Sequence, residues 1–266
     1  FRETMLTDRR IRHLTDFPDA RDAFPGAGDG IAGGICYFLW DRDNAGPCLV
    51  ETFGKEKKRE PVERDLNEFE IFIRDNRAIH IIRKVLSHGE DRFSTIVSAR
   101  MPFGLRTYEE SVPGGDLYMF SSRGDGKTLR KGITKNPEWI DQWKVLLSAT
   151  ASEHAGQAGK DGKKKVLSRI EVMKPGTVCT ESYLVLGPFS TKKETTNAIS
   201  YLQTKFLRFL VSTATLTQHV TRSSFNFSPI QNFTKSWTDE ELYTKYGLNK
   251  EEIDFIESTI REIDSD

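Results

Sequence analysis

Short apolar segments separated by glycine and proline turns dominate the middle of this chain, and they constrain its fold more than any other feature. From Phe93 onward, turn-forming residues recur every few positions, which favours short strands over long helices. These residues are Pro102, Gly104, Pro113, Gly114, Gly115, Gly124, Gly126 and Gly132. Helical spacing of apolar residues flanks this region, at 69–86 and at 198–209. The sequence therefore predicts an α+β fold.

The first part of the chain predicts a small sheet. Residues 1–12 have the pattern of the end of a helix, and 11–17 that of a short strand. Residues 35–40 form a continuous apolar run of the buried-strand type, and after a turn residues 48–53 supply the other arm of a hairpin. The glycines of 24–34 precede a strand instead of following one, so this loop is not a nucleotide phosphate loop.

Helix starts are marked by capping boxes. A Thr or Asn is followed three residues later by Glu at 191–194, 238–241 and 249–252. The first box opens the helix that contains the apolar positions of 198–209. The other two open a pair of short helices near the end of the chain.

Composition limits the class of protein. The chain has 266 residues, 37% hydrophobic and 29% charged, which is typical of a folded globular protein with a sizeable core. No apolar run approaches the ~20 residues of a membrane span, and no secretory leader opens the sequence. The three cysteines form no CxxC pair, and we expect buried thiols in a reducing cytoplasm. The sequence contains no Cys/His cluster, so it does not predict a metal site.

Charge is segregated along the chain although its formal net value is zero. Residues 237–266 hold ten acidic and three basic residues, a net charge of −7, so residues 1–236 carry +7. The basic excess gathers at 55–59, 123–135 and 160–165. This pattern suits a polyanion such as DNA. On charge alone, solvated surface loops are the better explanation.

One short pattern suggests metal-dependent cleavage. Pro18 and Asp19, followed by Glu56 and Lys57–Lys58, match the Pro-Asp…Glu-x-Lys arrangement in which two acids hold Mg²⁺ and a lysine steadies the developing charge. The pattern is short and degenerate, and Glu56 lies in a charged segment typical of a linker. We interpret it as a chance match and retain nuclease activity as an alternative.

Residues 1–53 resemble the carboxyl-terminal rim of the catalytic domain in adenine-N6 DNA methyltransferases, specifically the type IIG-like enzymes of restriction–modification systems. The resemblance is carried by the helix at 1–10, the strand at 11–17, Asp22-Ala-Phe-Pro-Gly26 and the segment 31–40. It implies that Phe24 lies beside the flipped-base pocket and stacks on the extruded adenine, where an aromatic face returns part of the unstacking cost. The alternative is that Phe24 only anchors a loop.

The remaining chain is similar to the target recognition region and tail that follow such a methylase core. The carriers are 98–106, 188–189 and 233–243. In addition, 180–186, a helix and then 217–222 resemble the recognition domains of type I specificity subunits. The resemblance thus covers nearly the whole chain.

The resemblance implies four parts. Residues 1–54 are the rim, at the end of a Rossmann-like methyltransferase sheet, and 55–92 are a linker and connecting helix. Residues 93–236 are a target-recognition-type α+β domain, and 237–266 are an acidic helical tail.

Two family motifs are absent from this sequence. Neither the Asn-Pro-Pro-Tyr motif that grips the target amine nor the glycine-rich loop that binds S-adenosylmethionine is present. In the family both lie upstream of the part matched here. We therefore expect a fragment that binds no cofactor and cannot methylate alone, with S-adenosylmethionine bound by the missing upstream half of the parent protein.

The hydrogen-bonding groups that bases present in the major groove of DNA indicate which residues are candidates for reading the sequence. Arg bridges guanine O6 and N7, and Gln pairs with adenine N6 and N7, so Gln218 and Arg222 are candidate base readers, with His219 beside them. Other basic residues contact phosphates or bases, or form plain surface ion pairs. The full set of candidate DNA-contacting residues is Arg100, Arg106, Arg123, Lys127, Arg130, Lys131, Gln218, His219 and Arg222.

The sequence thus predicts the sequence-specific DNA recognition part of an adenine-specific methyltransferase or restriction–modification enzyme, acting on double-stranded DNA in the cytoplasm and away from membranes. Three alternatives stay open: a nuclease part, a subunit-interaction module that docks through its acidic tail, and an inert structural piece.

Overall fold

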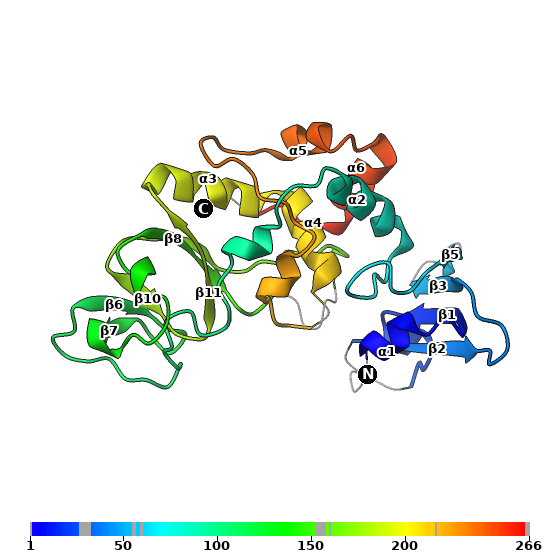
Figure 1. The fold of residues 1–266 in the computed structure, drawn as a ribbon, viewed down its shortest axis with the longest axis horizontal. Coiled ribbons are helices and arrows are strands. Elements are labelled where there is room, and N and C mark those ends of the chain that lie inside the picture. The colour runs from blue at the N-terminus through cyan, green and yellow to red at the C-terminus, as the bar shows by residue number, and fades with distance from the viewer. Residues whose placement is uncertain are drawn as a thin grey trace. The chain divides into compact units, whose positions relative to one another are not determined.

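The chain forms two compact units, Phe1–Arg83 and Lys84–Asp266 (Figure 1). The structure, a computed structural model, describes residues 2–26, 33–54, 57–58, 61–152, 158–159, 161–215 and 217–263. The division between the units falls within 55–92, the segment expected to connect two domains. The mixture of small sheets and helices confirms the predicted α+β class.

The first unit is built on a small mixed sheet. Its elements are α1 (Arg2–Thr7), β1 (Ile11–Phe17), β2 (Ile35–Trp40), β3 (Cys48–Gly54), β4 (Lys57–Lys58), β5 (Val62–Arg64) and the start of α2 (Asn76–Ser87). The strand order is β2-β1-β3-β4, with β5 also paired to β3. Strand β1 lies antiparallel to β2 and parallel to β3. One face of this sheet packs a small core of Ile11, Leu14, Cys48, Val50 and Leu66.

The predicted hairpin of 35–40 with 48–53 is wrong. Strand β1 lies between the two segments, because Leu14 pairs with Phe38 on one side and with Val50 on the other. A turn between two apolar runs predicts adjacency, but a preceding strand can insert between them, and local pattern does not report that choice.

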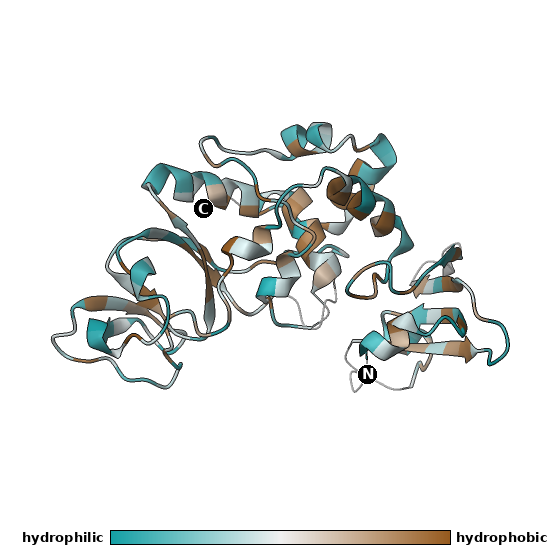
Figure 2. Cartoon of the chain, in the orientation of Figure 1, coloured by the Kyte–Doolittle hydropathy of each residue, from teal (hydrophilic) through white to brown (hydrophobic). Residues whose placement is uncertain are grey.

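The expectation that 35–40 is buried is also wrong. Strand β2 is the last strand in its order among the described strands, and Tyr37 and Leu39 expose 60% and 59% of their surface. Phe38 and Trp40, which point to the opposite face, are exposed as well. Figure 2 shows this apolar strand at the rim of the sheet. A continuous apolar run predicts a strand that is covered on both faces, and the described residues of this unit do not cover β2 in that way.

Helix α2 begins at Asn76, later than the apolar spacing from Phe69 predicted. The Asp75 carboxylate accepts the Arg77 N–H at 3.1 Å, which satisfies a free donor at the helix start. Just before it, the Thr52 hydroxyl donates to the Arg74 carbonyl at 2.7 Å, and the Arg74 guanidinium donates to Asp16 at 2.9 Å. These contacts hold the preceding residues in a non-helical path against the sheet.

The second unit combines, over its described residues, two sheets with four further helices. Its strands are β6 (Leu117–Phe120), β7 (Gly126–Thr128), β8 (Trp143–Ser148), β9 (Ile170–Met173), β10 (Thr177–Cys179) and β11 (Tyr183–Phe189). Its helices are α3 (Lys192–Gln203), α4 (Lys205–Ala214), α5 (Asp239–Lys245) and α6 (Lys250–Thr259). The strands form two three-stranded sheets, β10-β6-β7 and β11-β8-β9. Both sheets contribute to one core, which includes Leu117, Met119, Leu146, Cys179 and Val185.

All three predicted capping boxes are confirmed, at Thr191, Thr238 and Asn249. The helix predicted through 198–209 is instead two helices, because Thr204 has an extended backbone and its side chain accepts the Leu207 N–H to start α4. Spacing alone misses this break, since the apolar positions of α3 and α4 continue in phase across it.

Helices α5 and α6 of the acidic segment pack into the second unit. Helices α5 and α6 contact α4 within the second unit, and Leu242, Ile256 and Ile260 are fully buried. Of the cysteines, Cys48 and Cys179 are buried as predicted, whereas Cys36 on β2 is exposed. No helix in the described part of the chain is long and apolar enough to cross a membrane.

Lys144 on β8 is a fully buried cation within the second unit. Its Nζ donates to the carbonyl oxygens of Trp139, Ile140 and Gln142 at 2.6–3.1 Å. Burial lowers the pKa of Lys144 to about 8, because desolvation disfavours the ammonium form.

This shift predicts a pH-dependent stability. From about pH 8 to about pH 10, the unfolded chain keeps a proton on Lys144 that the folded chain has released, so the free energy of unfolding rises with pH, by at most about 3 kcal/mol. Urea unfolding across this range checks the effect. Lys144→Met should remove the rise, whereas the exposed control Lys174→Met should keep it. An identical pH profile in both variants contradicts the assignment.

Candidate nucleic-acid interface

Two of the predicted arginines converge on one carboxylate. Arg100 Nη2 donates to Glu181 Oε2 at 2.8 Å, and Arg106 Nη1 donates to the same oxygen at 3.4 Å. The arginine side chains are 75% and 47% exposed, whereas Glu181 is only 13% exposed. A shielded carboxylate thus holds two solvent-facing guanidinium groups in one place.

The short connection between β10 and β11 carries Glu181, and backbone hydrogen bonds fix it at successive residues. The Thr180 N–H donates to Phe120 O, the Glu181 N–H donates to Leu105 O, and the Ser182 carbonyl accepts the Ala149 N–H, each at 3.0 Å. On either side, Cys179 and Tyr183 are buried in the core shared by the sheets. Glu181 is therefore presented from a rigid corner and not from a free loop.

Three hydroxyl groups meet at Ser182, the residue after Glu181 in the chain. Ser182 Oγ is 2.8 Å from Thr107 Oγ1 and 2.8 Å from Ser122 Oγ. Each hydroxyl can donate or accept, so the trio can adapt to either kind of partner. Ser122 opens the turn between β6 and β7, which places the exposed Arg123 next to the cluster in the chain.

The segment with Gln218 and His219 reaches the same corner through the backbone. Val220 N–H donates to Ala149 O at 3.0 Å, and Ala151 N–H donates to Gln218 O at 2.8 Å. Ala149 is the residue that also bonds Ser182. Both Gln218 and His219 are exposed, so this segment extends the polar surface along the end of β8.

Arg222 lies further along the same sheet. Its Nε donates to the Val97 carbonyl at 2.6 Å, and Val97 bridges to Leu186 on β11. Glu181 precedes the same strand, five residues before Leu186, which corresponds to roughly 17 Å of extended chain. Arg222 is thus held beside the middle of β11, whereas Glu181, which holds Arg100 and Arg106, precedes that strand.

The remaining predicted cations are spread over the β6–β7 hairpin and beyond. Lys127 is exposed on β7, opposite Tyr118. Arg130 follows β7 and forms a paired contact with Asp141, with both nitrogen–oxygen distances at 2.8 Å. Lys131 is exposed beside it. The structure therefore brings Arg100 and Arg106 together and does not bring Arg130 and Lys131 to them.

Sequence reasoning missed Glu181, Ser182, Ser122 and Thr107. A search for positive charge ignores an acid, and isolated hydroxyls carry no signal. The one usable signal is that Thr180-Glu-Ser182 interrupts two apolar segments with polar residues, which predicts a surface corner between strands.

The structure describes only some of the candidate functional residues of the first unit. Phe24 is 55% exposed and follows the 3-10 turn Ala20–Asp22, with its N–H donating to Ala20 O at 2.9 Å. Asp19 of the nuclease-like pattern accepts from the Arg21 side chain, and Glu56 lies outside the described residues. Within the described ranges, no group of three or more His, Cys, Asp or Glu side chains is arranged to hold a metal ion.

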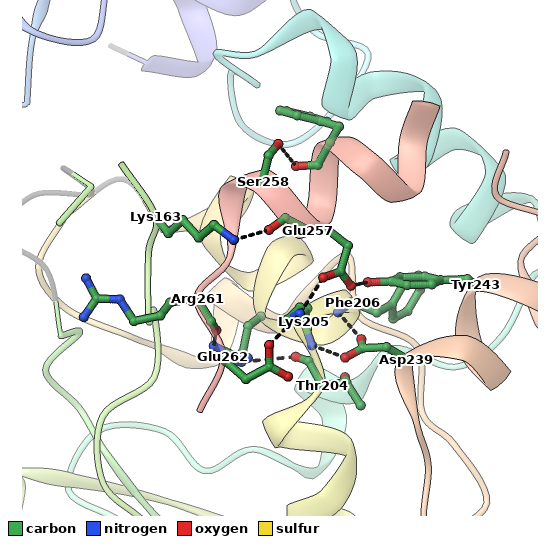
Figure 3. Close-up of polar contacts among 12 residues, drawn as sticks. Lys163, Thr204, Lys205, Phe206, Asp239, Tyr243, Glu257, Ser258, Arg261 and Glu262 are labelled. Carbon is green, nitrogen blue, oxygen red and sulfur yellow. Dashed lines mark hydrogen bonds and ion pairs between the residues drawn. The ribbon is translucent and has the colours of Figure 1, made fainter. Parts of the chain in front are cut away.

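A second polar cluster joins α4 to the last two helices, and it is shown in Figure 3. The Asp239 carboxylate accepts the N–H groups of Lys205 and Phe206, at 3.0 and 2.8 Å, at the start of α4. Lys205 Nζ contacts Glu257 and Glu262, and Tyr243 donates to Glu257 at 2.9 Å. Burial raises the pKa of Asp239. The charged groups of this cluster thus pair with one another.

The cavity at this cluster is lined by Gln203, Lys205, Arg208, Asp239, Glu262 and Ile263. Its volume of about 110 Å³ is well below the roughly 300 Å³ at which small-molecule sites begin. We interpret the cluster as an anchor for the acidic segment, and the Glu181 corner as the candidate functional site.

Comparison with known proteins adds a class to this geometry. No protein-family model matches the chain. An "Uncharacterized adenine-specific methylase" of Mycoplasma pneumoniae is 30% identical over 84 residues, which is 31% of this chain and 19% of that protein. Among solved structures, the type IIG restriction endonuclease BpuSI aligns over 93% of this chain and 40% of its own, with 9% identity and a TM-score of 0.34.

The methylase relative confirms the resemblance to adenine-specific methylases inferred from the sequence. The chain spans about a fifth of the length of this curated relative, so the match by itself does not transfer the activity of the whole methylase to this chain.

The anchor cluster predicts a stability difference between two lysines. Lys205 is 13% exposed and contacts two carboxylates, whereas Lys250 is 87% exposed and pairs with Asp254 on the surface of α6. Lys205→Met should lower the free energy of unfolding by about 1–3 kcal/mol, because it leaves the Glu257 carboxylate, 37% exposed, without its cation. Lys250→Met should change it by less than about 0.5 kcal/mol. Urea denaturation measures both, and equal effects contradict the anchor role.

Proposed function

We propose that this chain is the DNA recognition part of an adenine-specific methylase of a restriction–modification system. The observation that supports it most directly is the convergence of Arg100 and Arg106 on Glu181 at a rigid corner of the second unit. Glu181 contacts both guanidinium groups, and the Glu109 carboxylate accepts the Arg106 backbone N–H, so what this corner offers is exposed arginine donors held in place and not an excess of charge. Exposed arginines with unused donors are suited to phosphates and to base edges in the major groove.

The neighbouring residues enlarge this surface. Gln218 and His219 adjoin Ser182 through Ala149, and Arg123 follows Ser122 in the chain. Lys127, Arg130, Lys131 and Arg222 are assigned to more distant phosphate contacts, which position a protein on DNA without reading its sequence. Glu252 and Glu257 of α6 pair with Lys84 and Lys205 of their own unit, so these two acids are matched within the chain.

The cofactor of the parent enzyme is assigned to another part of that protein. The chain lacks the glycine-rich loop of S-adenosylmethionine sites, and the cavity beside Asp239 is too small for a nucleoside cofactor. We therefore derive no methyl-transfer step from these residues. As a restriction–modification component, the parent would act in the cytoplasm, where DNA lies.

The first unit is proposed to complete the sheet of a methyltransferase half. Strand β2 presents apolar side chains on both faces and has no neighbour beyond it among the described strands. Strands β1 and β3 are parallel, a pairing that usually requires a crossover segment lying over the sheet. A strand and flanking helices from the upstream half would supply that cover. Phe24, exposed near this sheet, would then stack on a flipped adenine.

DNA binding through the corner is tested with the double variant Arg100→Ala/Arg106→Ala. Binding of the 266-residue chain to a duplex oligonucleotide should weaken at least about tenfold near 0.1 M salt, and the slope of log affinity against log salt should fall by about 1–2. Fluorescence anisotropy at several salt concentrations measures both quantities.

Arg42→Ala is the matched control, since Arg42 is 77% exposed and pairs only with its neighbour Asp43 in the first unit. It should leave affinity and slope nearly unchanged. A wild-type chain that binds no duplex even in dilute buffer refutes the proposed function.

The exposed edge strand predicts self-association of the isolated chain. Leu39→Lys should raise several-fold the highest concentration at which the chain is still monomeric. The reason is that a charge on an apolar strand edge opposes edge-to-edge pairing. Sedimentation velocity measures this, with Tyr108→Lys as the control at a 66% exposed aromatic of the second unit. An equal effect of both substitutions contradicts a special role for β2.

A further inference from the structure

The carboxylate between the two arginines needs an explanation that DNA affinity does not give. An acid on a DNA-binding surface repels phosphates, so Glu181 weakens general affinity. It is nevertheless the most shielded charge of the corner, at 13% exposed, and both arginines donate to its Oε2. Its connection is fixed by three backbone hydrogen bonds at successive residues. The arrangement therefore orients the arginine side chains at the expense of positive charge on this surface.

Order matters because a free arginine has many rotamers. A long surface side chain loses conformational entropy when it binds, and holding it beforehand lowers that cost. In the described contacts, Arg100 uses Nη2 and Arg106 uses Nη1 on Glu181, so other donors of each guanidinium stay available. Arg106 is also held at its backbone, where its N–H donates to Glu109 at 2.8 Å.

We infer that Glu181 is a positioning residue that orients Arg100 and Arg106 to read guanine in duplex DNA; this rests on the proposed function and deepens it. An arginine fork pairs with guanine O6 and N7 in the major groove, which is the commonest specific contact of this side chain. Ser182, which follows Glu181 in the chain, contacts the hydroxyls of Thr107 and Ser122, and each of these three hydroxyls can accept from or donate to a base edge.

Removing the charge of Glu181 should therefore have two opposite effects. Glu181→Gln keeps the shape of the side chain but adds one unit of net positive charge. General affinity for DNA should rise or stay constant, because phosphates are no longer repelled. Discrimination for guanine should fall, because the arginines are no longer held. A residue that only maintained the fold would lower both quantities together.

The experiment uses the 266-residue chain and a duplex selected from a pool with a randomised centre. The guanines of the selected duplex are then replaced by 7-deazaguanine, which removes the N7 acceptor and leaves Watson–Crick pairing intact. We expect the wild-type chain to lose at least about tenfold in affinity on this replacement. Glu181→Gln and Arg106→Ala should each lose less than about threefold. Glu251→Gln, an equal charge change at an exposed position of α6, should behave as wild type.

Equal 7-deazaguanine losses in the wild type and in Glu181→Gln overturn the positioning role, as does a selected duplex whose affinity does not depend on guanine. Circular dichroism confirms that each variant is folded before comparison. The two proposals fail differently: no duplex binding at all refutes DNA recognition, whereas binding without a guanine effect refutes only this inference.

Discussion

The core shared by the sheets β10-β6-β7 and β11-β8-β9 is the constraint on which the second unit depends. Cys179 and Tyr183 are both buried in it, so the short connection between β10 and β11 must turn within a few residues. Backbone hydrogen bonds to Phe120, Leu105 and Ala149 then fix each residue of that turn. Apolar burial thereby places a carboxylate and nearby hydroxyls at a defined point of the surface, where arginines from a distant segment meet them.

The first unit shows the opposite situation, in which apolar surface lacks cover. Its small core holds β1 and β3 together, yet β2 carries large side chains that face solvent on both sides. Exposed apolar strand edges promote pairing with another strand, and natural sheets avoid them. This mismatch is the physical reason for assigning the unit to a larger sheet.

Electrostatics divides the second unit between stability and recognition. Glu252 and Glu257 of α6 pair with Lys84 and Lys205, and Lys163 donates to the Glu257 backbone carbonyl, so these contacts hold the last helices to the rest of the unit. At the Glu181 corner a shielded carboxylate instead orients two exposed guanidinium groups. The second unit thus uses one set of ion pairs as an anchor and another to hold arginines at its surface.

The sequence by itself determined the α+β class, the capped helix starts at Thr191, Thr238 and Asn249, and the family resemblance, because capping and residue spacing are local properties. It did not determine that β1 inserts between β2 and β3, that Thr204 divides a helix, or that β2 is exposed. Nor could it find Glu181, whose arginine partners lie 81 and 75 positions away in the chain. Strand order and side-chain convergence are set by long-range packing, and only the tertiary structure decides them.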